Sequence, residues 1–203
     1  PGVRVSLDGV ANDGPFDTDY ATPGQQGATE NVGTDIEQVT GTNYADTLTG
    51  GPNDDTLDGN SGPDTISGGA GNDTLKGGSG TDTFVAEPGA DTYDGGNDTG
   101  DSLSYAARGG SGVTLSLDSA PNDGQAGVDG LGSGGAGAAA DNILATFNGK
   151  VIGTSQADTI AGGTGHDQLV GGPGPDTIRG GAIGATNDGN DLIDGGTGGD
   201  TLD

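Results

Sequence analysis

The chain has 203 residues, of which 47 are glycine, and it carries a formal net charge of −26 at pH 7. Only 28% of its residues are hydrophobic, a composition typical of disordered chains unless another interaction stabilises a fold. The five Lys and Arg residues argue against a nucleic-acid partner, and no apolar run is long enough for membrane insertion. Cysteine is absent, so a folded form must rely on something other than disulfides, and bound cations would also offset the charge.

The first 40 residues are predicted to be a spacer that contains β-strands. Alternating apolar residues at Val3, Val5 and Leu7 predict a half-buried strand, and Ile36–Val39 predicts another. The residues around 15–30 lie between these strands, and their turn-forming composition predicts a loop.

Residues 41–104 contain a first array of a nine-residue unit, G-G-x-G-x-D-x-U-x, in which U is a large apolar residue. Regular copies read GGPNDDTLD (50–58), GNSGPDTIS (59–67), GGAGNDTLK (68–76) and GGSGTDTFV (77–85). Two later copies depart from this pattern. Ala86-Glu87-Pro88 replaces the first three positions of one, and the copy at 95–104 has one extra residue.

Residues 105–152 duplicate the spacer, and residues 153–203 contain a second array. GVTLSLDSAPNDG (112–124) aligns with GVRVSLDGVANDG (2–14), and strands are predicted at 113–117 and 147–152. The stretch 138–147 is the one candidate for a helix, and residues around 125–137 are predicted to form a loop. In the second array the copy at 180–194 carries six extra residues.

The nine-residue unit constrains the fold because one apolar residue per unit cannot close a core alone. Stacked units would align these side chains in a continuous column. Glycine permits the left-handed turn conformations, and the threonines that flank the apolar position favour strand. Each unit is therefore predicted to form a six-residue turn and a very short strand. The turn carbonyls and the Asp at position six are oxygen ligands of the kind that Ca²⁺ takes.

This consensus resembles the RTX (repeats-in-toxin, haemolysin-type) calcium-binding family. The resemblance implies an all-β fold, a right-handed parallel β-roll or β-helix solenoid with Ca²⁺ in the turns. We expect two rolls, each preceded by a spacer that extends the solenoid. The resemblance also implies that turn carbonyls, together with the position-six Asp residues of two turns on the same side, hold each ion.

The candidate metal ligands are the position-six aspartates and the turn glycines. The aspartates are Asp46, Asp55, Asp64, Asp73, Asp82, Asp91, Asp101, Asp158, Asp167, Asp176, Asp191 and Asp200. The glycines are Gly50, Gly59, Gly62, Gly68, Gly69, Gly71, Gly77, Gly78, Gly80, Gly162, Gly163, Gly165, Gly171, Gly172, Gly174, Gly195, Gly196 and Gly198. The implied ion positions lie between Asp46 and Asp64, Asp64 and Asp82, Asp82 and Asp101, Asp55 and Asp73, Asp73 and Asp91, Asp158 and Asp176, Asp176 and Asp200, and Asp167 and Asp191. About eight Ca²⁺ ions would bring the net charge to about −10.

These features favour an extracellular calcium-binding structural module that folds on Ca²⁺ after export, a route that for RTX proteins is typically type I secretion. Such a module would serve as a scaffold: a surface adhesin stalk, an S-layer component or a filament subunit with head-to-tail self-association. The alternative is the C-terminal RTX domain of a secreted lipase or metalloprotease. Neither HExxH nor GxSxG occurs in the 203 residues, and the single His166 cannot complete a catalytic set, so we predict no catalytic residue and no enzyme activity. An ice- or sugar-binding solenoid is a third hypothesis, which the recurring threonines favour less than support of the fold.

Overall fold

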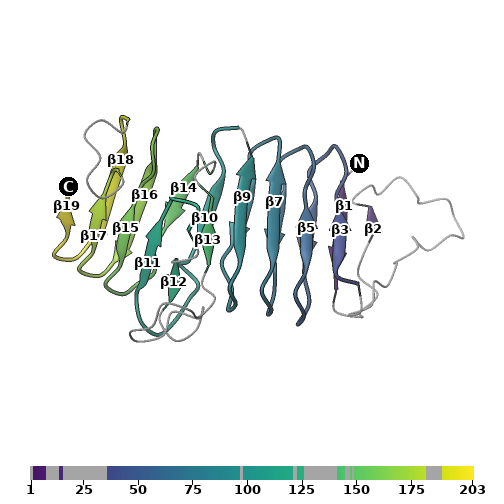
Figure 1. Ribbon diagram of the computed structural model, residues 1–203, viewed down its shortest axis with the longest axis horizontal. Helices are drawn as coiled ribbons and strands as arrows, with labels where there is room; N and C mark the ends of the chain where they lie inside the picture. Colours follow the sequence, from purple (N-terminus) through teal and green to yellow (C-terminus); the bar gives the residue numbers. More distant parts are fainter. Residues whose placement is uncertain are drawn as a thin grey trace, which may run out of the picture.

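The computed structural model describes residues 2–7, 14–15, 36–96, 98–120, 123–125, 141–144, 147, 149–181 and 189–203. This part of the chain forms short strands and no helix, stacked along one long axis (Figure 1). The strands are β1 (Val3–Ser6), β2 (Gly14–Pro15), β3 (Gln38–Thr40), β4 (Thr47–Thr49), β5 (Thr56–Asp58), β6 (Thr65–Ser67), β7 (Thr74–Gly78), β8 (Thr83–Val85), β9 (Thr92–Gly96), β10 (Ser102–Ser104), β11 (Val113–Ser116), β12 (Gly124–Gln125), β13 (Asn142–Ile143), β14 (Lys150–Ile152), β15 (Thr159–Ala161), β16 (Gln168–Pro173), β17 (Thr177–Arg179), β18 (Leu192–Thr197) and β19 (Thr201–Leu202). No helix in these ranges is long and apolar enough to cross a membrane.

Two faces of sheet enclose the core. One face is a nine-stranded sheet in the order β18-β16-β14-β10-β8-β6-β4-β1-β2. The other face consists of two five-stranded sheets, β12-β11-β15-β17-β19 and β13-β9-β7-β5-β3. Consecutive strands of an array alternate between the faces, so neighbours in one sheet are two units apart, eighteen residues in the regular copies, as in the parallel pair Thr47↔Thr65. The predicted parallel β-roll is confirmed.

The apolar residue of each unit points into the space between the faces. In the nine-stranded sheet Leu48 pairs with Ile66 and Ile66 with Phe84, which gives the predicted continuous column. All three side chains have 0% exposure. Aromatic side chains take the apolar positions near the middle of the chain. The ring centroid of Phe84 lies 6.1 Å from that of Tyr93 and 5.9 Å from that of Phe147. Burial of these side chains is the apolar contribution to the stability of the fold.

The second spacer joins the two arrays into one solenoid. β10, the last strand of the first array, pairs in parallel with β14, and β9 pairs with β13. β11 comes earlier in the sequence than β13 but lies further along the solenoid, where it pairs with β15. The nine-stranded sheet therefore passes through both arrays, so the expectation of two rolls is corrected to one continuous roll.

The duplication seen in the sequence recurs in the structure. In each copy the first strand forms an antiparallel pair with a two-residue strand, Val3↔Pro15 in one and Val113↔Gln125 in the other. Each first strand then pairs in parallel with the first strand of its array. β4 belongs to the nine-stranded sheet but its counterpart β15 belongs to the opposite face, so the second array is turned by half a coil.

Most local predictions for the spacers agree with the structure. Strands were predicted at 3–7, 36–39, 113–117 and 147–152, and β1, β3, β11 and β14 lie in or overlap these ranges. The one candidate for a helix, 138–147, contains a strand where the structure describes it, because Asn142–Ile143 is β13. The parallel pairing of Asn142 with Thr92 satisfies backbone groups of this segment, and the nearby glycine residues lower its propensity to form a helix. Pro15 and Gln125 belong to short strands, and the rest of the predicted loops lies outside the described residues.

Candidate metal centres

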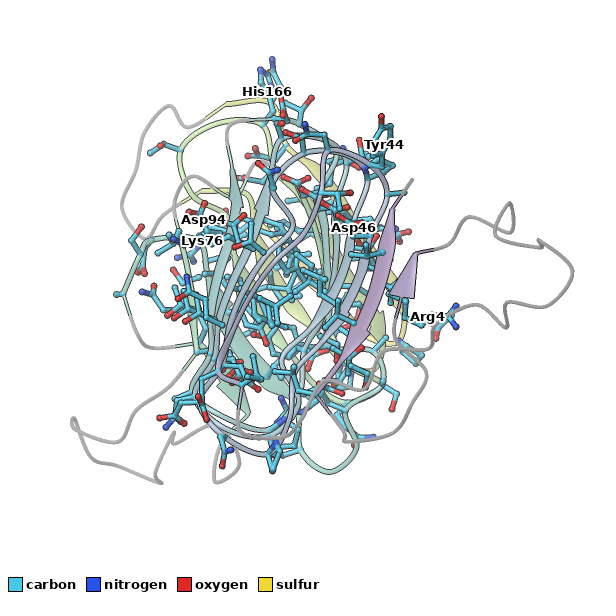
Figure 2. All side chains as sticks on the ribbon, turned by 90° about the vertical axis from the view of Figure 1, so that its right-hand side faces the viewer. Arg4, Tyr44, Asp46, Lys76, Asp94 and His166 are labelled. Carbon is cyan, nitrogen blue, oxygen red and sulfur yellow. The ribbon has the colours of Figure 1, made fainter. Side chains whose placement is uncertain are left out.

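Ten of the twelve predicted aspartate ligands lie buried inside the turns. Their exposure is 4% or less, whereas Asp191 and Asp200, in the last coils, are partly exposed. The buried aspartates are Asp46, Asp55, Asp64, Asp73, Asp82, Asp91, Asp101, Asp158, Asp167 and Asp176. In the view along the long axis, Asp46 points into the molecule, while Tyr44 of the same turn points away from it (Figure 2). A carboxylate buried in this way is costly unless hydrogen bonds or a cation compensate its charge.

One carboxylate oxygen of each pair joins neighbouring turns. The backbone N–H of Asp46 donates to Oδ1 of Asp64 at 2.8 Å, and the same bond recurs along each side of the solenoid. It links Asp55 to Asp73, Asp64 to Asp82, Asp73 to Asp91, Asp82 to Asp101, Asp158 to Asp176, Asp167 to Asp191 and Asp176 to Asp200, at 2.8–3.0 Å. The structure thus brings together all eight predicted pairs. The extra residues before Asp101 and Asp191 leave the ladder intact.

The other carboxylate oxygen lacks a hydrogen-bond donor at five positions. Among the described residues, Oδ2 is buried without a partner in Asp64, Asp73, Asp82, Asp101 and Asp176. An unsatisfied buried oxygen is a net cost to a fold, and five of one kind at equivalent positions form a repeated feature. A positive charge or a hydrogen-bond donor next to each of these five oxygens would remove the cost of burying it.

The first glycine of each turn leaves room beside this oxygen. A Cβ added to Gly59 would collide with Oδ2 of Asp64 and would lie 2.8 Å from the carbonyl oxygen of Gly77 in the next turn. In the second array a Cβ on Gly171 would collide with Asp176 and lie 2.8 Å from the carbonyl oxygen of Gly195. A carboxylate oxygen and a carbonyl oxygen of the next turn therefore border the same small space. Hard cations such as Ca²⁺ prefer this donor set.

Left-handed glycines bring further carbonyl groups close together. Gly78 and Gly80 have φ of 99° and 139°, which residues with a side chain rarely adopt. A Cβ on Gly78 would collide with the carbonyl oxygen of Asn60, and one on Gly80 with the carbonyl oxygen of Gly62. The predicted glycine ligands thus line turns whose backbones stack too closely for any larger residue.

The electrostatics of the turns also indicate a need for a cation. Burial raises the pKa of Asp64 from 3.8 to about 7, with neighbouring carboxylates adding to the shift and a backbone hydrogen bond opposing it. Burial likewise raises the pKa of Asp73 and of Asp101 to about 6. The pKa values of Asp82 and Asp176 are raised for the same main reason. A divalent cation next to these groups would favour their ionised forms.

Asp141 extends the ladder and was missed by the sequence prediction. The N–H of Asp91 donates to Oδ1 of Asp141 at 2.8 Å, although the two residues are fifty positions apart. Here tyrosine hydroxyls supply the remaining donors: Tyr105 donates to Oδ2 of Asp141 at 2.7 Å and Tyr93 to Oδ2 of Asp91 at 3.1 Å. Asp141-Asn142-Ile143 keeps the D-x-U order of the consensus, and this is the signal that could have found it.

Side chains alone do not assemble a metal centre in the described part of the chain. No three Asp, Glu or His side chains there form a group able to hold a metal ion. A site in these turns must therefore draw on backbone carbonyl oxygens, as the predicted ligand set does. His166 is exposed at the upper rim of the view along the long axis (Figure 2), and its Nδ1 lies 3.0 Å from the carbonyl oxygen of Asn190 in the neighbouring turn.

The repeat geometry agrees with a comparison to known families. A family model described as the RTX calcium-binding nonapeptide repeat (4 copies) matches residues 32–66, 58–93, 67–100, 151–182 and 185–203. These stretches cover more than half of the chain. The chain belongs to the RTX calcium-binding repeat family. No curated protein matches it.

RTX repeats bind calcium and indicate a calcium-binding module of secreted proteins. Such a module is structural, and the match points to no enzyme family. The residues of this RTX chain fit calcium, because orphaned Asp oxygens and bare glycine turns meet at equivalent places along the roll. Asp64, Asp73, Asp82 and Asp176 with the turn carbonyls would hold the ions, which would supply positive charge and crosslink successive turns.

Proposed function

We infer that this RTX chain is an extracellular scaffold module whose folding depends on calcium. The observation that carries this proposal is the set of buried aspartate oxygens without a donor, repeated at equivalent positions in a roll with a net charge of −26. A fold that buries these carboxylates is penalised until a cation neutralises them. Calcium binding would therefore contribute folding free energy directly.

The location of the protein follows from the strength of such sites. Calcium sites of extracellular modules have dissociation constants of about 10⁻⁴–10⁻³ M, so they fill outside the cell and stay empty in the cytosol. The chain would then remain unfolded during export, as type I secretion requires, and would fold outside. Without calcium its thin apolar core has to overcome the repulsion among its carboxylates.

A scaffold role is supported by the continuity of the roll. One nine-stranded sheet passes through both arrays, and this gives the described part of the chain an elongated shape (Figure 1). Solenoids of this kind are extended through contacts between neighbouring coils only. The parallel pairing of β10 with β14 joins the first array to the spacer that leads into the second, and similar parallel pairing between copies would produce head-to-tail association. Sedimentation velocity in calcium at rising protein concentration tests this, and a monomer throughout would contradict it.

Circular dichroism in calcium and in EGTA tests the proposed folding function. We expect a β-sheet spectrum in calcium, a disordered spectrum in excess EGTA, and full recovery when calcium is restored. Magnesium at the same concentration serves as a control for ionic strength, because it demands stricter octahedral geometry than these turns offer. A β-sheet spectrum that EGTA leaves unchanged would overturn the proposal.

A further inference from the structure

Nine turns of the roll fall into two classes. The consensus does not separate these classes, because GGTGHD (162–167) and GGPGPD (171–176) both match it but belong to different classes. In the first class, here called closed turns, the N–H of the second residue donates to Oδ2 of the Asp in the same turn. Closed turns are those of Thr42 with Asp46 (2.5 Å), Gly51 with Asp55 (2.6 Å), Thr154 with Asp158 (2.7 Å) and Gly163 with Asp167 (2.9 Å). The hydroxyls of Thr42 and Thr154 donate a further bond to the same carboxylates. Oδ2 of each of these four aspartates therefore has a donor within the protein, and in Asp46 and Asp158 Oδ1 has one as well.

In the second class, here called open turns, the second residue is left-handed and the Asp Oδ2 has no donor. Open turns are those of Asn60 (φ 73°) with Asp64, Gly69 (93°) with Asp73, Gly78 (99°) with Asp82, Gly96 (102°) with Asp101 and Gly172 (109°) with Asp176. The N–H of the second residue now points elsewhere. That of Asn60 donates to Asp58, and that of Gly69 to Glu87.

The class of a turn follows from what it packs on. Closed turns are the first on each side of each array, so they lie against the spacer. The N–H groups of Val3 and Val113 donate to Oδ1 of Asp46 and Asp158, at 2.5 and 2.8 Å. Open turns instead stack on another turn of the array. A Cβ added to Gly172, for example, would collide with the carbonyl oxygen of Thr154.

The two remaining closed turns also pack on the spacer, although their second residue is glycine and not threonine. A Cβ on Gly51 would meet the carbonyl oxygen of Leu7 at 3.0 Å, and one on Gly163 would meet that of Leu117 at 2.6 Å. Both residues are glycine, so the closed form does not depend on the identity of the second residue. The pattern recurs in both copies at a constant offset of 112 residues, which makes the second copy an independent repetition of the first.

We propose that calcium occupies only positions that begin with an open turn, and that closed turns are completed by hydrogen bonds instead. In a closed turn the N–H presents its positive end to the carboxylate oxygen where a cation would lie, so protein donors already compensate the charge. The ions then lie between Asp64 and Asp82, Asp73 and Asp91, Asp82 and Asp101, and Asp176 and Asp200. The other four family-implied pairs, which begin with Asp46, Asp55, Asp158 and Asp167, take none. This inference rests on the proposed function and departs from the uniform occupancy that the repeat implies.

Asp101 is an exception among the open turns. A Cβ on Gly95 would lie 2.6 Å from Oδ2 of Asp101 and 3.1 Å from the ring of Phe147. Beside Asp64 and Asp176, by contrast, the equivalent Cβ would lie 2.8 Å from a carbonyl oxygen of the next turn. The ring of Phe147 borders the space beside Asp101 on that side, so this residue serves the ion that it shares with Asp82 and starts no site of its own.

Counting the bound ions on the intact chain tests this inference. Native mass spectrometry and equilibrium dialysis with elemental analysis, both at saturating calcium, should give four ions per chain. Eight ions would overturn the inference and leave the proposed function standing. A folded chain that binds no calcium would overturn both.

A matched pair of variants in the second array gives a separate test. Asp176→Asn changes an open turn and should lower the count by one ion, whereas Asp158→Asn changes a closed turn one coil away and should leave it unchanged. Loss of an ion from Asp158→Asn would contradict the assignment. If that variant does not fold by circular dichroism, Asp46→Asn, its counterpart in the first array, replaces it, and the wild-type count stands as the test that needs no variant.

Discussion

At the scale of single residues, the two carboxylate oxygens of an open-turn aspartate have different roles. Oδ1 of Asp64 accepts the N–H of Asp46, which joins two coils, while Oδ2 of Asp64 stays buried without a donor. Oδ1 therefore contributes to the fold, whereas Oδ2 is available to a ligand. The periodic placement of aspartate was readable from the sequence, because the consensus fixes its distance from the apolar residue. The different roles of its two carboxylate oxygens could not be predicted from the sequence, because they depend on the backbone of the neighbouring turn.

The first glycine of an open turn should tolerate no side chain. We expect Gly59→Ala to destabilise the calcium-bound fold by about 1–3 kcal/mol, because its Cβ would collide with Asp64 and crowd the carbonyl oxygen of Gly77. Gly109→Ala is the matched control, since a Cβ there meets nothing within 4 Å. Denaturant unfolding at saturating calcium measures both variants. Equal stability of the two variants would show that the turn is not close-packed.

Asp123 should make stability depend on pH. Burial raises its pKa from 3.8 to about 8, although the N–H groups of Ser116 and Ile143 donate to it and oppose the shift. Between about pH 4 and pH 8, Asp123 therefore holds a proton in the folded state that it has lost in the unfolded state. Its contribution to stability is complete below about pH 4 and declines by up to ~1.4 kcal/mol per pH unit as the pH rises toward 8.

The test of this pH effect compares wild type with Asp123→Asn, unfolded by denaturant in saturating calcium from pH 5 to pH 9. The amide cannot ionise, so the wild type should lose stability relative to the variant as the pH rises. Because both proteins keep the same turn aspartates, the calcium dependence cancels in the difference. A difference that stays constant over this range would show that Asp123 does not titrate as described.

At the scale of elements, the spacer between the arrays is where sequence-based prediction fell short. The alternation Val113, Leu115 and Leu117 correctly predicted a strand, since period-two alternation needs only local information. The reversed spatial order of β11 and β13 involves a pairing between Thr92 and Asn142, which no local pattern encodes. The closed turns are a similar case, because GGTGHD (162–167) and GGPGPD (171–176) both match the consensus, yet Gly163 packs on the spacer and Gly172 on another turn.

The junction at β13 should depend on the tyrosine hydroxyl that satisfies Asp141. We expect Tyr105→Phe to destabilise the fold by about 1–3 kcal/mol, since it leaves a buried carboxylate oxygen without its donor. Tyr44→Phe is the control, because Tyr44 is 58% exposed and lies at the surface of a turn. Thermal unfolding in saturating calcium measures the effect. A Tyr105→Phe variant as stable as Tyr44→Phe would mean that Asp141 finds another donor.

At the scale of the whole molecule, charge and core size set the conditions for folding. A net charge of −26 and a core one residue wide in each strand leave little stability without a counter-charge. The solenoid is built from neighbour contacts, so a cation between two turns strengthens the interface on which the next coil stacks. In the proposed arrangement the closed turns need no ion, so hydrogen bonds alone complete the first coil of each array once the roll folds.

The most direct test of calcium-dependent folding is small-angle X-ray scattering of the same sample in calcium and then in excess EGTA. An unfolded chain of this length has a radius of gyration of about 48 Å, whereas a compact fold of the same length has one of about 17 Å, and the elongated roll should lie close to this lower value. The account predicts the smaller value in calcium, the larger one in EGTA and a return on adding calcium back. A radius of gyration that remains at the folded value in EGTA would contradict it.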